Sequence, residues 1–266
     1  MSDPAPDAAT NTPPNVAANA GGVVPGQPWG RTRPPSFEQS GEQSSDQLNE
    51  ASSAGAVPIP IRGDDAALAA ALDRYPAGTR FRFQPDAHSD LARALGLSAT
   101  SESPGTTELP VDTLRVHREP RPDPAGMTVV NLAVLGHAPQ ATQAWHRRRP
   151  CVVEIDGRER FAGSATGVVV ANGQYLQGFD LVPRGHPGDG RLEVHVYCLP
   201  PGQRRAMRRR LPSGTQVPHP AIRTFSGRTV RVRWAQQRPV ALDGRPAAPS
   251  VELEASIEPG RLLLVV

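Results

Sequence analysis

Side chains able to do nucleophilic or metal chemistry are few in this chain of 266 residues, and their spacing favours neither. The cysteines Cys151 and Cys198 have no spacing typical of a disulfide framework or a metal site. The seven histidines show no paired ligand spacing, and no serine lies in a Gly-x-Ser-x-Gly motif. We therefore expect no nucleophilic catalysis, and two small buried cysteines in a reducing compartment.

Arginine is the residue type that gathers in one place. Five arginines fall within seven residues on a short predicted helix between Pro201 and Pro212: Arg204, Arg205, Arg208, Arg209 and Arg210. Such a helix could contact an anionic membrane surface, where each basic residue adds about 1 kcal/mol, and Arg147–Arg149 could widen the patch. The alternative is a solvated helical face, because all 29 basic residues are arginine and the composition indicates a GC-rich bacterial genome. No aromatic residues are interleaved with these arginines, so nucleic acid is not an expected partner.

Composition limits the fold that positions these residues. Glycine (25) and proline (30) make up about a fifth of the chain, against about 12 % in an average protein. This excess excludes a helical bundle or coiled coil and favours a turn-rich β protein. No apolar run is long enough to span a membrane, and the N-terminus does not resemble a signal peptide. We expect a cytoplasmic protein, attached peripherally to the inner face of the membrane if the arginine helix meets lipid.

Charge separates the first 56 residues from the rest. Residues 1–56 lack apolar periodicity and carry two arginines against six acids, whereas the remaining 210 residues have a net charge of +7. A segment of this composition cannot bury enough apolar surface to offset the entropy lost on ordering, so we predict a disordered acidic arm.

The body begins as a short α/β segment and continues as strands. An apolar run at 56–61 precedes a predicted helix at 65–74, a strand at 79–83 and a helix at 91–95. Asp156-Gly157 and Asp243-Gly244 occupy hairpin-turn positions, and helices are predicted at 140–147 and 202–210. The predicted strands lie at 111–116, 127–135, 151–155, 160–162, 167–171, 192–199, 229–234, 240–242, 251–255 and 262–266. The predicted fold class is α+β and mostly β, with an antiparallel β-sandwich-like domain.

Five stretches of the chain carry a resemblance to a known family. Val168–Tyr175 is an apolar strand leading into Ala-Asn-Gly-x-Tyr, and Asp189–Val194 reads Asp-Gly-x-Leu-Glu-Val. Asp90–Leu97, Asn131–Gly136 and Leu242–Gly244 follow the order of three further motifs. Together they resemble the diacylglycerol kinase-like lipid kinases. Beyond the disordered arm already predicted at 1–56, the resemblance implies a remnant of an α/β nucleotide lobe at 57–110 and a β-sandwich lobe on the lipid side at 111–266. The active site is expected between the lobes.

The resemblance is incomplete at the nucleotide site. The family's Gly-Gly-Asp-Gly-Thr loop, whose glycines let backbone N–H groups approach phosphate, corresponds to Arg62-Gly63-Asp64-Asp65-Ala66. Only Gly63 and Asp64 match, and these two are the candidate nucleotide-binding residues. A second loop appears as Pro85–Asp90, one residue short and without its glycine. Most of the family's nucleotide sheet has no counterpart in residues 1–56.

The family's catalytic and metal positions are also altered. The acid expected to take the proton of the lipid hydroxyl corresponds to Arg245, which stays protonated. Asp243 remains as the candidate catalytic residue, although a hairpin turn uses Asp-Gly in any case. The family's Mg²⁺ loop keeps Asp189 and Glu193 as candidate ligands. His137 follows a strand end where the family approaches its cleft, and it is the histidine to test.

Three functions follow as hypotheses. The preferred one is a degenerate lipid kinase homologue that serves as a lipid-binding or regulatory pseudokinase without robust phosphotransfer. The second is an active kinase for a diacylglycerol or sphingoid-type lipid hydroxyl, with ATP and Mg²⁺ as cofactors, completed by a partner or a second copy. The third is an interaction scaffold whose residues 1–56 recruit a protein partner. The expected partners are an anionic membrane lipid and a protein bound by the arm, and an oligomer is compatible with the sequence.

Overall fold

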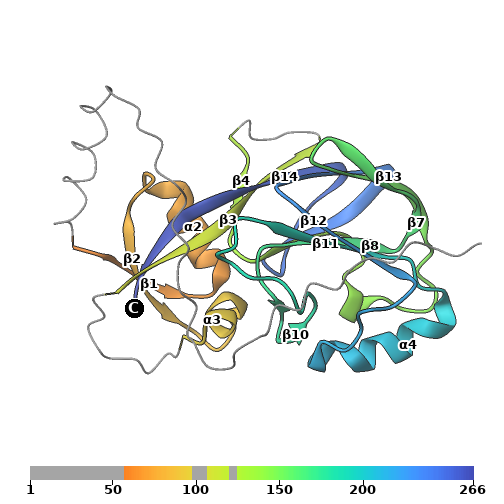
Figure 1. Ribbon diagram of the computed structural model, residues 1–266, viewed down its shortest axis with the longest axis horizontal. Coiled ribbons are helices and arrows are strands. Elements are labelled where there is room, and N and C mark those ends of the chain that lie inside the picture. The colour runs from red at the N-terminus through yellow and green to blue at the C-terminus, as the bar shows by residue number, and fades with distance from the viewer. Residues whose placement is uncertain (1–56, 98–106, 120–124) are drawn as a thin grey trace, which may run out of the picture. The chain divides into compact units, whose positions relative to one another are not determined.

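The computed structural model of the protein describes residues 57–97, 107–119 and 125–266. These residues form a mostly β fold with an antiparallel, sandwich-like body (Figure 1), which confirms the predicted fold class. The predicted disordered arm at 1–56 lies outside the described residues.

The α/β segment consists of β1 (Ile59–Gly63), α2 (Asp65–Arg74), β2 (Arg80–Pro85) and α3 (Asp90–Leu95). β1 and β2 pair in parallel, with Ile59 opposite Phe81. α2 begins where the Asp64 side chain accepts a hydrogen bond from Ala67 N, and α3 begins where Ser89 caps Ala92 N. These caps satisfy N–H groups that have no partner within the helix, and both helices were predicted.

The sandwich has two facing layers with a shared apolar core. The upper layer in Figure 1 contains β3, β13 and β14, and the lower layer contains β8, β11 and β12. The core between them is formed by alternate strand residues such as Val168 and Val170 of β8 and Val230 and Val232 of β13. The strands are β3 (Glu108–Glu119), β4 (Met127–Val129), β5 (Leu132–Gly136), β6 (Arg149–Ile155), β7 (Arg158–Ala165), β8 (Gly167–Ala171), β9 (Tyr175–Leu176), β10 (Phe179–Asp180), β11 (Leu192–Tyr197), β12 (Ile222–Gly227), β13 (Thr229–Leu242) and β14 (Arg245–Val265).

The lower layer is buried on its second face as well. Val169 and Ala171 of β8 point away from the sandwich core and pack with Met207 of α4 (Pro201–Arg210) and with Leu211, which opens the 3₁₀ turn η2 (Leu211–Ser213). Because both faces are covered, β5 and β8 are continuous apolar runs rather than alternating ones. The predicted helix at 202–210 is confirmed as α4.

β14 joins the α/β segment to the sandwich. It pairs antiparallel with β13 and β3, and its last residues pair in parallel with β2, where Leu264 lies opposite Phe81. The predicted boundary at 110/111 therefore falls inside β3, which already pairs with β14 at Glu108. The described residues on both sides of this boundary belong to one compact unit.

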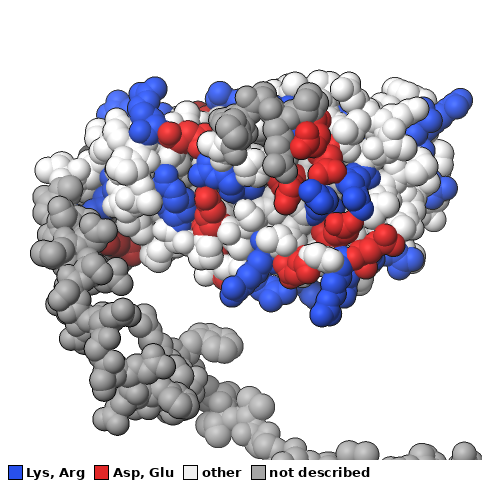
Figure 2. All heavy atoms as spheres, turned by 90° about the horizontal axis from the view of Figure 1, so that it is seen from above, with Lys and Arg blue, Asp and Glu red and all other residues white. Residues whose placement is uncertain are grey.

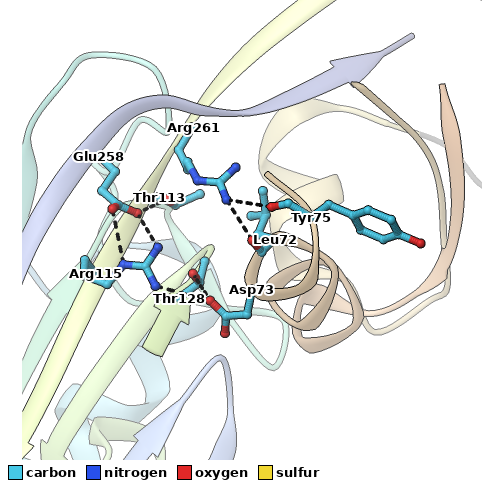
Figure 3. Close-up of polar contacts among 8 residues, drawn as sticks. All are labelled: Leu72, Asp73, Tyr75, Thr113, Arg115, Thr128, Glu258 and Arg261. Atoms are coloured by element: carbon cyan, nitrogen blue, oxygen red, sulfur yellow. Dashed lines mark hydrogen bonds and ion pairs between the residues drawn. The ribbon is translucent and has the colours of Figure 1, made fainter. Parts of the chain in front are cut away.

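Polar contacts hold α2 against the sandwich (Figure 3). Arg115 of β3 donates two hydrogen bonds to the Glu258 carboxylate of β14, both 3.2 Å, and a third to Asp73 Oδ1 of α2 at 3.3 Å. Thr128 of β4 also donates to Asp73, while Arg261 of β14 donates to the carbonyl oxygens of Leu72 and Tyr75. The position of α2 is therefore fixed by the strands of the sandwich.

Some predicted elements differ from the structure. The predicted helix at 140–147 is wrong: only the 3₁₀ turn η1 (Pro139–Ala141) forms there, because arginines of α4 bind the carbonyl oxygens that a helix would use. The predicted strand at 127–135 is split into β4 and β5. The strand β12 was not predicted, and the predicted pairs of strands at 229–242 and 251–266 are the continuous strands β13 and β14.

Candidate functional site

One pocket gathers the predicted nucleotide and catalytic positions. It has a volume of about 430 Å³ and lies where β1 meets α2, β2 meets α3 and β13 meets β14. Asp64, Asp243 and Arg245, which are distant in sequence, all line it. The full set of lining residues is Asp64, Asp65, Ala87, His88, Ser89, Asp90, Arg93, Gln177, Gly178, Asp243, Gly244 and Arg245.

Asp243 binds a row of backbone N–H groups. Its carboxylate accepts hydrogen bonds from Val130 N (3.0 Å), Asn131 N (2.9 Å) and Leu132 N (3.0 Å). The hairpin turn supplies this geometry, because Asp243 and Gly244 both have positive φ, 46° and 75°. Val130 and Asn131 donate to this carboxylate instead of to a neighbouring strand, and the predicted strand breaks at these two residues, between β4 and β5.

Asp65 and Asp90 play the same part for two other segments. Asp65 accepts from Ser89 Oγ (2.6 Å) and from Leu91 N at the start of α3, and also from Asn131 Nδ2 (3.2 Å). Asp90 accepts from Gln177 N and from Gly178 N (2.9 Å) in the turn between β9 and β10. Each carboxylate therefore fastens a different segment of the chain to the pocket wall.

Arg245 spans the pocket to Asp64. Its Nη2 lies 2.6 Å from Asp64 Oδ2, and the same carboxylate caps α2. The neighbouring candidate Gly63 has a φ of 131° and its carbonyl oxygen accepts from Asp86 N (2.9 Å). Gly63 thus shapes the turn from β1 into α2, although it is not among the residues that line the pocket.

Burial and mutual repulsion raise the pKa of two of these carboxyl groups. Burial raises the pKa of Asp65 to about 6, and the charge of Asp90 adds to the rise. Burial raises the pKa of Asp243 to about 7, and the charge of Asp65 contributes. Partial burial alone would raise the pKa of Asp64, but the hydrogen bonds from Arg245 and Ala67 N outweigh it and lower that pKa.

The pocket is a poor match to a polyphosphate. Anion sites in proteins present free backbone N–H groups and net positive charge. Here six such N–H groups already bond to the carboxylates of Asp65, Asp90 and Asp243. Four aspartates line the pocket against two arginines. The residues present therefore do not fit the triphosphate of ATP.

The predicted Mg²⁺ loop is held by protein groups. Asp189 accepts from Arg191 N (2.9 Å), and Glu193 is a half-buried residue of β11 whose pKa is raised by burial. A third carboxylate, Asp112, accepts from Gly190 N (2.7 Å) and Gly260 N (2.8 Å) and ties this loop to β14. Among the residues that the structure describes, no group of three or more His, Cys, Asp or Glu side chains could hold a metal ion.

Sequence reasoning assigned no role to Asp112 or Gln177. Asp112 lies inside the strand β3, and Gln177 contributes a backbone N–H group that its side chain does not reveal. No local sequence signal could have identified either contact.

The predicted membrane patch needs a correction. Arg204 is only 2 % exposed and Arg208 is half-buried, because both side chains point toward the segment after η1. Arg204 Nη1 donates to the carbonyl oxygens of Gln143 and His146, and Arg208 Nη1 donates to that of Thr142. Arg205, Arg209 and Arg210 are exposed. The predicted patch therefore keeps only these three of its five arginines exposed on the surface.

His137 lies apart from the pocket. Its ring stacks on that of His146, with centroids 3.7 Å apart. Burial lowers the pKa of His137 to about 4, and the charges of His146, Arg238 and Arg204 add to the fall. At neutral pH His137 is therefore uncharged. Burial and the charges of Arg204 and Arg238 also lower the pKa of His146.

Sequence comparison places the sandwich in a known family. The family model for the YegS C-terminal NAD kinase beta sandwich-like domain matches residues 128–266, more than half of the chain. The chain belongs to this family. The matched YegS-type domain includes β5 to β14, and therefore Asp243, Arg245, the Asp189 loop and α4. No curated protein sequence matches the chain.

Solved structures support the same fold for the YegS-type protein. A diacylglycerol kinase from Bacillus anthracis str. Sterne has a TM-score of 0.60 at 17 % identity, over 82 % of this chain and 79 % of that one. Two further structures, of a protein from that organism proposed to be a diacylglycerol kinase, have TM-scores of 0.62 and 0.63 at 15 % identity, over 82 % of this chain and 81 % of theirs. The resemblance predicted from sequence is thus confirmed for the family and the fold. Within the described residues, no helix is both long and apolar enough to cross a membrane.

Proposed function

We propose that this protein is a degenerate member of the diacylglycerol kinase-like group that binds lipid or regulates a partner and lacks robust phosphotransfer. The observation that carries the proposal is the occupation of the pocket by its own carboxylates. Backbone N–H groups that could donate hydrogen bonds to phosphate oxygens already donate to the carboxylates of Asp65, Asp90 and Asp243. A polyphosphate would have to displace buried acceptors and approach four aspartates.

The position of Arg245 supports the same proposal. The lipid hydroxyl would need a base at this position, and a guanidinium group cannot accept a proton. Arg245 instead forms an ion pair with Asp64 at 2.6 Å. The protein therefore lacks both a phosphate cradle and a base at the places where the resemblance implies them.

An active kinase is the second candidate, and one observation favours it. The pKa of Asp243 is raised to about 7, which is the range that suits a general base at neutral pH. Both of its oxygens, however, already accept backbone hydrogen bonds. This candidate requires Asp243 to release those bonds when substrate binds.

Titration with Mg-ATP, followed by thermal unfolding, distinguishes the two. A ligand at about 100 times its Kd stabilises the folded state by about 2.7 kcal/mol, which raises the Tm of a domain of this size by about 5–10 °C. We expect no saturable rise at millimolar Mg-ATP, and no phosphorylated diacylglycerol in a radiolabel assay. A saturable rise or a labelled lipid would refute the proposal in favour of the active kinase.

A further inference from the structure

Two segments distant in sequence form one exposed surface beside α4. We call it the arginine–tryptophan surface and define it by its exposed residues: Trp145, Arg147, Arg148, Arg149, Arg205, Arg209 and Arg210. The first four follow η1, and the last three belong to α4. The surface lies outside the pocket described above.

Arg204 holds the two segments together. Its Nη1 donates to the carbonyl oxygens of Gln143 (2.7 Å), Ala144 (3.1 Å) and His146 (2.6 Å), on both sides of Trp145. Arg148 Nη1 returns a hydrogen bond to Cys198 O (3.1 Å), next to the start of α4. Trp145 is therefore presented from a backbone that is fixed to the helix.

The helix divides its arginines between two faces. Arg204, Met207 and Arg208 lie on the side that packs inward, at the spacing of a buried helical stripe. Arg205 and Arg209, four residues apart, share the outer side, and Arg210 is also exposed. The outer face therefore presents cations to solvent.

No acidic residue neutralises this surface along the chain. No Asp or Glu occurs between Asp123 and Glu154, or between Glu193 and Asp243. The face of the molecule seen in Figure 2 differs, because blue and red groups lie side by side on it. Ion pairs on the sheet join Arg231 to Glu252 and Arg233 to Glu154. Among the described residues, the exposed arginines of the arginine–tryptophan surface form no such pair.

Trp145 points to the kind of partner. It is 74 % exposed, and the other large exposed hydrophobic residues in the described part of the chain are Val57 and Val266. An indole ring beside cations suits the headgroup region of a bilayer, where the ring finds an apolar layer and the arginines find phosphates. Non-specific binding of single-stranded nucleic acid uses several stacking aromatics along a groove, and this surface offers one.

We propose that the arginine–tryptophan surface binds an anionic lipid bilayer, with Trp145 inserted at the interface and the arginines on the lipid phosphates. That the ligand is a lipid and not another polyanion rests on the proposed function. The location of the surface rests on charge and exposure alone. Because the surface is separate from the pocket, vesicle binding and Mg-ATP titration give independent results.

Co-sedimentation of the full chain with vesicles tests the proposal. Phosphatidylcholine vesicles containing phosphatidylglycerol should bind the protein, pure phosphatidylcholine vesicles should bind it poorly, and added salt should weaken binding. Each cation near the membrane strengthens binding about fivefold, so R205Q/R209Q/R210Q should weaken it about 100-fold. The control R82Q/R158Q/R160Q removes the same charge from exposed positions elsewhere, and its binding should change far less.

Tryptophan fluorescence provides the second measurement. The difference in emission between wild type and W145F isolates Trp145, and this difference should shift to the blue when anionic vesicles are added. Equal loss of binding in both triple variants would overturn the proposal, because net charge rather than this surface would then govern it. An unshifted Trp145 emission, or tighter binding to a DNA oligonucleotide than to anionic vesicles, would overturn it as well.

Discussion

Replacing Arg204 by glutamine should cost this protein a large part of its stability. Arg204 is 2 % exposed, and its Nε and Nη1 atoms donate to the carbonyl oxygens of Leu199, Gln143, Ala144 and His146. Nη1 carries two hydrogens, which its three acceptors share. With the one hydrogen on Nε, three hydrogens of Arg204 therefore take part in hydrogen bonds. A hydrogen bond from a charged group contributes about 1.5–3 kcal/mol.

The expected loss is smaller than the full sum, because water can reach some of the released carbonyl oxygens. We therefore expect R204Q to lower the free energy of unfolding by about 3–5 kcal/mol. For a domain of this size each kcal/mol corresponds to about 2–4 °C, so the Tm should fall by about 10 °C. R204K keeps the positive charge but should recover only part of the loss, because one ammonium group cannot reach all four carbonyl oxygens.

Thermal unfolding by circular dichroism, together with hydrogen exchange, measures the effect. R205Q is the matched control, since it removes the same charge from an exposed neighbour, and it should change stability by less than about 0.5 kcal/mol. Amides of residues 142–149 should exchange faster in R204Q than in R205Q. If the two variants unfold within about 2 °C of each other, Arg204 does not hold this segment and the reasoning fails.

Three further outcomes follow from the site and its supports. R245E alone should give no phosphorylated diacylglycerol in a radiolabel assay, because Asp65, Asp90 and Asp243 still occupy the backbone N–H groups; labelled lipid from this single variant would contradict that. Burial raises the pKa of Asp243 to about 7, so the native state holds a proton that the unfolded chain releases above about pH 4. The stability of wild type relative to D243N should therefore fall as pH rises from about 4 to 7 in urea titrations, and a constant difference would argue against the shift. R115M leaves Glu258 and Asp73 without their shared cation and should lower the free energy of unfolding by about 1–3 kcal/mol; hydrogen exchange in α2 that matches wild type would show that other contacts hold this helix.

Elements fixed by local chemistry were predictable from the sequence. The turns at Asp156-Gly157 and Asp243-Gly244 were predicted because few residue pairs adopt two consecutive positive φ angles, and both turns form. α4 was predicted from a stretch bounded by prolines, and Pro201 is its first residue.

Elements decided by distant side chains were not predictable in this way. Residues 140–147 have helical composition, but Arg204 and Arg208 take their carbonyl oxygens. The break between β4 and β5 depends on the carboxylate of Asp243, more than 100 residues away in sequence.

In the candidate site, too, the positions of residues were predictable and their contacts with distant groups were not. The resemblance brought Asp64, Asp243 and Arg245 together correctly, because their motifs retain their order. It did not predict the ion pair of Arg245 with Asp64, nor that the carboxylates would bind the backbone of the pocket wall. Arg245 and Asp65 depart from the family pattern, whereas Asp90 and Asp243 keep it. A motif gives residue types and their spacing, and it carries no information about the hydrogen-bond partners of either kind of residue.

The pairing of β14 with β2 has a consequence for synthesis of the chain. Phe81 of β2 gains its neighbour Leu264 only when about 180 further residues have been translated. At about 5–20 residues per second, the apolar faces of β1, β2 and α2 leave the ribosome roughly 10–40 seconds before the strand that covers them. Nascent chains of intermediate length therefore expose Leu68, Leu72 and Phe81, which are fully buried in the finished protein. During that interval this segment is a substrate for chaperones and proteases, and interrupted translation would yield a product without its closing strand.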